Sequence, residues 1–324
     1  MWKWFLAALL FFFVVLELTF FAPSRADRQI DFGGVGDIDT SSSSDIEQVL
    51  SGIELIESQG EKKMWELQSD MARKTKGKQD WQLDKVQVQF YGENQVQYEC
   101  AGKSGFVSED QQKLKIEGDV VITSSNGYIL QTDVVYYHTK NHTIEGPKPS
   151  KLKGLPEKEN QGGPLYMESE LFDADLNTNV INMKKNVRGR KRLSDGRLMR
   201  IRSQVAQFSG QSNSALFRQD VVMDMETMMV TGPRARFVYK GSALHSLFID
   251  GGVKIKDVGR WGVAGEAEVF FQEDKFIFRD NPKVVQSEDQ LIGDEIIVYD
   301  KGNRIQVLKA KSKYNTKESG DEGF

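Results

Sequence analysis

The stretch GDVVITSSNGYILQTDVVYY, from Gly118 to Tyr137, decides the fold of this chain. Apolar and polar residues alternate within each half, and an Asn-Gly pair that favours a tight turn separates the halves. Because side chains of a strand point alternately to its two faces, this period of two buries one face and exposes the other. The stretch therefore predicts a β-hairpin with one apolar face.

The same unit returns along the chain, which indicates a repeat. In each copy a polar residue or glycine precedes a valine, and a short strand, a glycine-containing turn and a second apolar strand follow. The intervals between the key valines are 67, 34, 32 and 31 residues, and the first spans two periods with a degenerate copy near residues 147–154. Repeats that pack on their neighbours predict an all-β fold, a twisted β-jellyroll or solenoid-like rolled antiparallel sheet. The key valines are Val120, Val187, Val221, Val253 and Val284.

Composition excludes several classes of protein. The 324 residues carry 43 basic and 47 acidic side chains, so the chain as a whole has no attraction for nucleic acid. A single cysteine, Cys100, excludes an internal disulfide framework and a cysteine-clustered zinc site. We expect no metal and no cofactor.

The amino terminus is strongly apolar. Residues Trp2 to Ala22 are interrupted only by Lys3 and Glu17. At ~1.5 Å per residue, a helix of this length is ~31 Å long and matches the hydrocarbon core of a bilayer. We favour an uncleaved single-span anchor over a cleaved signal peptide, for which Ser24-Arg25-Ala26 would be a weak site. Glycines and a run of serines then predict a tether, and Asp45 to Glu57 forms either a short amphipathic helix or an irregular segment.

Several segments resemble the LptC family of inner-membrane lipopolysaccharide export proteins. They are the apolar anchor, WELQSDMA at residues 65–72, WQLDKVQVQFY at residues 81–91, and the IEGDVVI and GYILQTDVVYY strands. Repeats after about Leu193 resemble the related periplasmic bridge protein LptA, and this extension makes the chain much longer than a usual LptC. The expected organisation is an anchor (1–24), a flexible linker (25–59), an LptC-like jellyroll (60–192), an LptA-like extension (193–310) and a polar tail (311–324).

The resemblance implies a non-enzymatic component of lipopolysaccharide transport. Such a protein is held in the inner membrane by one span, with most of its chain in the periplasm. It accepts lipopolysaccharide from an inner-membrane ABC transporter complex and passes it toward the outer membrane. An LptA-like bridge protein or the outer-membrane assembly would join it by pairing with an edge strand.

An apolar inner face would shelter acyl chains, since each buried methylene contributes about 0.8 kcal/mol. The alternative is that the same residues simply fill a closed core. Farther along the chain the expected inner face includes Val253, Ile255, Val269, Ile296 and Val298. The candidate lipid-binding residues are Val86, Val88, Phe90, Ile116, Val120, Ile122, Leu130 and Phe271, with Val135 beside them.

Nine basic residues lie between positions 184 and 202, opposed only by Asp195. Arginine forks pair with phosphate oxygens, so this cluster is a candidate contact for lipid phosphates or an anionic membrane. The alternative, which we favour slightly, is a solvated hairpin turning at residues 194–196. The candidate contacts are Arg188, Arg190, Arg192, Arg197 and Arg200.

Catalysis has little support in the sequence. His138 and His142 do not converge on a strand, and no acid of a zinc-protease motif lies between them. Glu266 and Glu268 share one face of a strand and suggest a glycosidase pair, but such pairs are common on solvent faces. The alternative function is a membrane-tethered carbohydrate-binding or carbohydrate-active β-solenoid, which needs a cleft of facing acids instead of an apolar interior.

Overall fold

The computed structural model describes residues 46–92, 96–108, 112–154, 162–209, 212–240, 243–299, 304–309 and 311–313. Within these ranges the regular structure is entirely β, and the strands form one antiparallel sheet. The predicted all-β rolled antiparallel sheet is therefore confirmed for this part of the chain. The predicted membrane anchor lies outside the described residues, and no helix among the described residues is long and apolar enough to span a bilayer.

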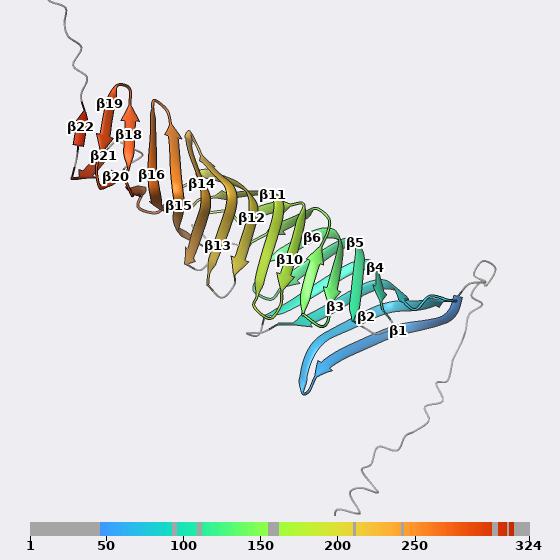
Figure 1. Ribbon diagram of the computed structural model, residues 1–324. Helices are drawn as coiled ribbons and strands as arrows, with labels where there is room; N and C mark the ends of the chain where they lie inside the picture. The colour runs from blue at the N-terminus through green and yellow to red at the C-terminus, as the bar shows by residue number, and fades with distance from the viewer. Residues whose placement is uncertain are drawn as a thin grey trace, which may run out of the picture. The chain divides into compact units, whose positions relative to one another are not determined.

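The first six strands form a meander in which each strand pairs with the next (Figure 1). The prediction of a helix or irregular segment at Asp45 to Glu57 is wrong. Residues 46–59, assigned from sequence to a flexible linker, form β1 along β2. Hydrogen bonding to the edge of β2 outweighs the weak local signal of this segment. The strands are β1 (Ile46–Gln59), β2 (Lys62–Thr75), β3 (Trp81–Tyr91), β4 (Gln97–Val107), β5 (Lys113–Ser124) and β6 (Ile129–His138).

After β6 the sheet divides into two arms. One end of β6 pairs with β7 and the other with β8. Strand β7 continues to β10 and β8 continues to β9, and both β9 and β10 then pair with β11. We call the side containing β7 and β10 the first arm and the side containing β8 and β9 the second arm. The strands are β7 (Thr143–Gly146), β8 (Ser150–Lys153), β9 (Tyr166–Ser169), β10 (Leu171–Asp175) and β11 (Val180–Arg192).

Strands β11 to β16 form a second meander of long strands that span both arms. The expected boundary at residues 192 and 193 falls in the turn between β11 and β12, which pair from Val180 opposite Ser209 to Arg192 opposite Leu198. The sheet is thus continuous across this position. The strands are β12 (Leu198–Ser209), β13 (Ser214–Met225), β14 (Met228–Lys240), β15 (Ala243–Asp257) and β16 (Arg260–Phe270).

Beyond β16 the two arms separate again. Strands β17, β20 and β21 continue the first arm, while β18, β19 and β22 continue the second. The strands are β17 (Lys275–Arg279), β18 (Lys283–Gln286), β19 (Asp289–Ile292), β20 (Glu295–Tyr299), β21 (Arg304–Leu308) and β22 (Lys311–Lys313).

The residue before four of the five key valines explains the repeat. At Asp119, Asn186, Asp220 and Gly252 the φ angles are 49°, 49°, 55° and 101°, which lie in the left-handed region. Each residue lies at an interruption of the strand pairing, where a β-bulge bends the long strand from one arm into the other. Asparagine, aspartate and glycine tolerate this conformation, which accounts for the polar residue or glycine in these four units.

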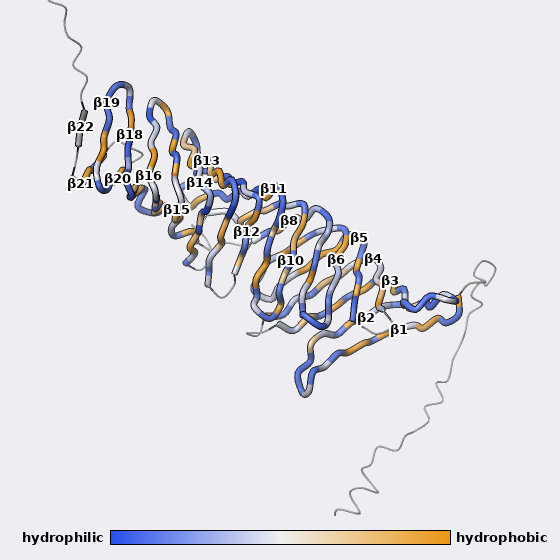
Figure 2. The backbone as a smooth tube through the Cα atoms, in the orientation of Figure 1, coloured by the Kyte–Doolittle hydropathy of each residue, from blue (hydrophilic) through white to orange (hydrophobic). Residues whose placement is uncertain are grey.

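Alternation along the strands produces one continuous core. Figure 2 shows hydrophobic and hydrophilic residues following one another along the strands. The inward side chains come from both arms and from strands β2 to β20, and they form a single buried cluster. Residues 45–324 accordingly make up one compact unit.

Candidate functional site

The interior between the two arms is the candidate functional site. The expected inner-face residues all lie on the buried side of their strands, except that Ile255 and Val298 are only partly buried. Burial makes them the inner face, while contact with a lipid stays a prediction. The buried members are Val86, Val88, Phe90, Ile116, Val120, Ile122, Leu130, Val135, Val253, Val269, Phe271 and Ile296.

Side chains pack closely in the part of the interior enclosed by β3 to β6. The rings of Phe90 and Tyr137 have centroids 4.5 Å apart, and the Tyr137 hydroxyl lies 3.0 Å from Nδ1 of His142. Tyr98 donates a hydrogen bond to Asn179, and burial raises the pKa of its hydroxyl to about 12. The candidate lipid-binding residues of these strands thus lie within a filled core.

A cavity of about 220 Å³ opens farther along the chain, between the arms formed by β14 to β21. Phe276, Phe278 and Val298 line it from the first arm, and Ile255 and Val284 line it from the second. Of these residues, the sequence analysis placed only Ile255 and Val298 on the inner face. The sequence around residues 276–278 carries no signal for a cavity, because a cavity depends on the spacing between the arms.

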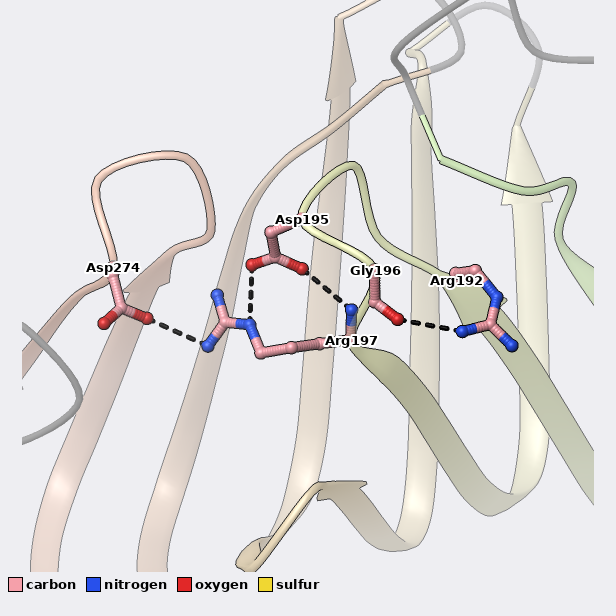
Figure 3. Close-up of polar contacts among 5 residues, drawn as sticks. All are labelled: Arg192, Asp195, Gly196, Arg197 and Asp274. Carbon is pink, nitrogen blue, oxygen red and sulfur yellow. Dashed lines mark hydrogen bonds and ion pairs between the residues drawn. The ribbon is translucent and has the colours of Figure 1, made fainter.

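Arg197 and Asp274 line one side of this cavity, and Figure 3 shows their polar contacts. The guanidinium of Arg197 donates hydrogen bonds to Asp195 at 2.6 Å and to Asp274 at 2.9 Å. Arg197 begins the second arm after the β11–β12 turn, whereas Asp274 belongs to the turn between β16 and β17 on the first arm. We call Asp195, Arg197 and Asp274 the clasp, because they join the ends of the two arms.

A second ion pair lines the cavity near the β15–β16 turn. Arg260 lies 2.8 Å from Asp257, which also accepts a hydrogen bond from Thr227 at 2.7 Å. Partial burial would raise the pKa of the Asp257 carboxyl, but hydrogen bonds from Thr227, Arg260 and the Val258 N–H outweigh it and hold the pKa below its usual value. The carboxylate is therefore charged at neutral pH and makes this rim polar.

Lys191 points into the interior beside the clasp. It is 3% exposed, and its ammonium donates a hydrogen bond to the carbonyl of Gly163 at 2.9 Å. Burial lowers the pKa of this ammonium to about 8. Lys191 is one of the nine basic residues between positions 184 and 202, and its burial becomes evident only from the fold.

The structure does not bring the five candidate phosphate contacts together. Arg197 is buried in the clasp. The other four side chains point outward from β11 and β12, where Arg190 lies directly opposite Arg200. The structure thus divides the cluster between a buried arginine and an exposed face. The exposed four are Arg188, Arg190, Arg192 and Arg200.

The candidates for catalysis are dispersed. Glu266 and Glu268 both point away from the core of β16, and Glu268 pairs with Arg279 at 3.3 Å. Cys100 is fully buried, and burial raises the pKa of its thiol to about 12. Within the described residues, no group of three or more histidine, cysteine, aspartate or glutamate side chains is arranged to hold a metal ion.

Comparison with known proteins identifies part of the chain. Residues 39–192 match the family model for LptC, described as lipopolysaccharide-assembly, LptC-related. No curated protein sequence matches the chain. Among solved structures, one similar chain is LptH, the LptA-homologous periplasmic component of the lipopolysaccharide transport device from Pseudomonas aeruginosa. It is 12% identical, with a TM-score of 0.34, and the match covers 36% of this chain and 95% of LptH.

The family match confirms the predicted resemblance to LptC over residues 39–192, and it bears on the prediction that the chain is not an enzyme. Proteins of the LptC family are non-enzymatic components of lipopolysaccharide transport, so the prediction that the chain is not an enzyme is confirmed. The matched residues include β1 to β11, and thus the strands β3 to β6 that enclose the filled part of the interior. Residues 39–192 are therefore an LptC-related, lipopolysaccharide-assembly domain.

Proposed function

We propose that this protein carries lipopolysaccharide away from an inner-membrane ABC transporter complex along the interior of its rolled sheet. The observation that carries the proposal is the continuity of the sheet and its core. Strands β11 and β12 pair along their length across residues 192 and 193, and the apolar cluster extends from β2 to β20. One chain thus offers an unbroken apolar interior from the LptC-related domain into strands that a usual LptC lacks.

The cavity between the arms supports this route. Its volume of about 220 Å³ is below the roughly 300–1,000 Å³ of pockets that enclose a whole small ligand. Such a space suits part of an acyl chain, whose burial contributes about 0.8 kcal/mol per methylene. The polar headgroup would remain outside, at the open side of the roll. An apolar interior also favours a lipid carrier over the carbohydrate-binding alternative.

The ends of the sheet supply the proposed contacts with partners. Strand β1 pairs only with β2 among the described strands, so its other edge is available for hydrogen bonding. Val49, Leu50 and Ile56 on β1 are about half exposed. At the other end, β21 and β22 each pair with one described neighbour. We propose that strand addition at these edges joins the protein to the transporter complex on one side and to an LptA-like bridge or the outer-membrane assembly on the other.

The proposed location follows from the amino-terminal sequence. An uncleaved span within residues 1–24 would hold the protein in the inner membrane, with the rolled sheet in the periplasm. Strands β12 to β22 would then act as an LptA-like extension. Protease accessibility in spheroplasts, compared with intact cells, tests this arrangement, since a periplasmic roll is cleaved only after the outer membrane is opened.

Photocrosslinking in cells tests the route. A benzoylphenylalanine at Ile255 or Val284 should capture lipopolysaccharide, because both side chains line the cavity. Phe90 is 1% exposed, so capture there requires the filled part of the roll to open. Tyr136 is the matched control, since it is 36% exposed and adjoins the buried Tyr137.

The expected result is capture at the three inner positions that depends on the ATP-driven extractor, with none at Tyr136. Each variant must first be shown to fold and to reach the membrane. Equal capture at inner and outer positions, or none at Ile255 and Val284 in a correctly folded protein, would overturn the proposal.

A further inference from the structure

The outer surface of the second arm carries an unusually dense group of cations. They lie on β8, β9, β11 and β12, where side chains pointing away from the core share one surface. All of them are exposed, and the exposed Tyr166 lies among them. We call this surface the basic face. Its cations are Lys151, Lys153, Arg188, Arg190, Arg192, Arg200 and Arg202.

Strand register places like charges against one another on the basic face. Arg190 lies directly opposite Arg200, and Arg188 lies directly opposite Arg202. Side chains in such positions have Cβ atoms about 4.5–5.5 Å apart, and like charges there destabilise the sheet. A partner that supplies negative charge at this surface would relieve this repulsion.

On the first arm of strands farther along the sheet, two cations have ion-pair partners. There, Arg234 forms an ion pair with Asp250 on the neighbouring strand at 2.6 Å. Arg279 lies between Glu268 and Glu295, at 3.3 and 2.7 Å. Arg234 and Arg279 are thus neutralised across strands, although Arg218 lies directly opposite Arg234. On the basic face, Arg202 alone among the described cations has an ion pair.

The basic face has few internal counterions. Glu168 lies opposite both Arg188 and Lys151, and Asp224 lies opposite Arg200 and 3.6 Å from Arg202. At one margin of the face, Asp119, Asp133 and Glu170 line a hollow together with Lys151 and Arg188. Among the described residues Arg188, Arg190 and Arg200 form no ion pair, and Arg190 instead lies over the ring of Tyr166, 5.2 Å from its centroid. The face therefore carries a clear excess of exposed positive charge.

The geometry indicates which anion fits. Four neighbouring strands about 4.8 Å apart give a surface roughly 14 Å wide, and the sheet twist turns more distant strands away from any flat partner. Guanidinium groups bind phosphate oxygens in a bidentate manner. A fluid headgroup layer can place phosphates wherever the guanidinium groups lie, whereas a folded acidic partner must match their register. Tyr166 adds an amphipathic side chain of the type enriched at membrane interfaces.

We propose that the basic face docks on a bilayer surface containing anionic phospholipids. This contact is on the outside of the roll, so it is independent of the proposed path for lipopolysaccharide through the interior. Because each basic side chain near an anionic membrane strengthens attachment by roughly fivefold, removing two should lower the ratio of docked to undocked protein by about 25-fold.

Full-length protein reconstituted into vesicles allows a direct test. A bimane is attached to Gln204→Cys, which lies at an exposed position of β12, while the buried Cys100 remains unlabelled. Quenching by lipid with a nitroxide on its headgroup reports how close β12 lies to the bilayer. Vesicles of phosphatidylcholine alone are compared with vesicles that also contain phosphatidylglycerol, at low and at high salt.

Two double variants with the same change in charge separate the basic face from net charge. Arg190→Gln/Arg200→Gln removes one pair of opposed arginines from the basic face. Arg218→Gln/Arg236→Gln removes two exposed arginines from the first arm. In addition, Glu168→Gln removes a carboxylate from the basic face and should increase docking by roughly fivefold.

We expect quenching that requires phosphatidylglycerol and weakens at high salt. Quenching should fall in Arg190→Gln/Arg200→Gln, persist in Arg218→Gln/Arg236→Gln and rise with Glu168→Gln. Equal quenching in both kinds of vesicle would overturn the proposal. An equal loss in both double variants would also overturn it, since attraction would then follow net charge alone. Capture of an acidic protein without any docking on phosphatidylglycerol would replace the membrane by that partner.

Discussion

The ion pair between Arg197 and Asp274 joins residues that are 77 positions apart, and its removal should loosen both turns of the clasp. The Arg197 side chain is 8% exposed, while those of Asp195 and Asp274 are 41% and 23% exposed. A hydrogen bond to a charged group contributes about 1.5–3 kcal/mol when buried, and partial exposure reduces this. We expect Arg197→Met to destabilise the clasp by about 2 kcal/mol and Asp274→Asn by about 1 kcal/mol.

Hydrogen exchange measures this local opening directly. The N–H of Leu193 bonds to the carbonyl of Arg197 at 2.8 Å, and the N–H of Gly196 bonds to that of Leu193 at 3.0 Å. On the other side, Phe270 pairs with Lys275 at the base of the β16–β17 turn. A loss of 2 kcal/mol corresponds to about 30-fold faster exchange of amides that exchange through local opening.

Arg197→Met should accelerate exchange on both sides, and Asp274→Asn should do so by about fivefold. The control is Lys85→Met, which removes an ion pair to Asp70 whose side chains are 80% and 63% exposed and should change exchange little. Faster exchange at residues 193–197 alone, with no change at residues 270–275, would refute the reasoning that the clasp couples the arms.

Three further predictions concern buried groups. Burial lowers the pKa of Lys191 from 10.5 to about 8, so the charge of its ammonium opposes folding at neutral pH. Lys191→Met should therefore raise the free energy of unfolding by about 2 kcal/mol below pH 8, and this gain should disappear as the pH rises from 8 past 10.5. A gain that is independent of pH would contradict this. The Cys100 thiol, whose pKa is raised to about 12 by burial, should react with a thiol reagent only after unfolding, and rapid labelling of folded protein would contradict its burial. Gly146→Ala should lower the free energy of unfolding by about 1–3 kcal/mol, because a Cβ atom at this position would clash with the ring of Phe172. An unchanged denaturation midpoint would count against this packing.

The strands and their inner faces were predictable because alternation is a local property of the sequence. Val86, Val88 and Phe90 are buried on one strand, as their spacing predicts. The polar residue or glycine before each key valine was also visible, although its role in bending the strand became clear only from the left-handed φ angles at residues such as Asn186. Strand β1 was missed, since its pairing depends on β2 and not on its own weak pattern.

The cavity and the clasp could not be predicted in the same way. Arg197 lay in a run of cations with no feature to distinguish it from Arg190 or Arg200. Its burial depends on the β11–β12 turn meeting the β16–β17 turn, a contact for which neither segment carries a local signal. The opposed arginines of the basic face likewise required the strand register.

The sequence by itself determined that the chain forms a rolled sheet with an apolar interior, because covalent geometry sends successive side chains of a strand to opposite faces. It also carried the resemblance that the LptC family match confirmed. Only the tertiary structure decided where the interior is filled, where it opens, and which cations point inward. These features depend on the distance between two arms of one sheet, and that distance is set by contacts between residues far apart in the chain.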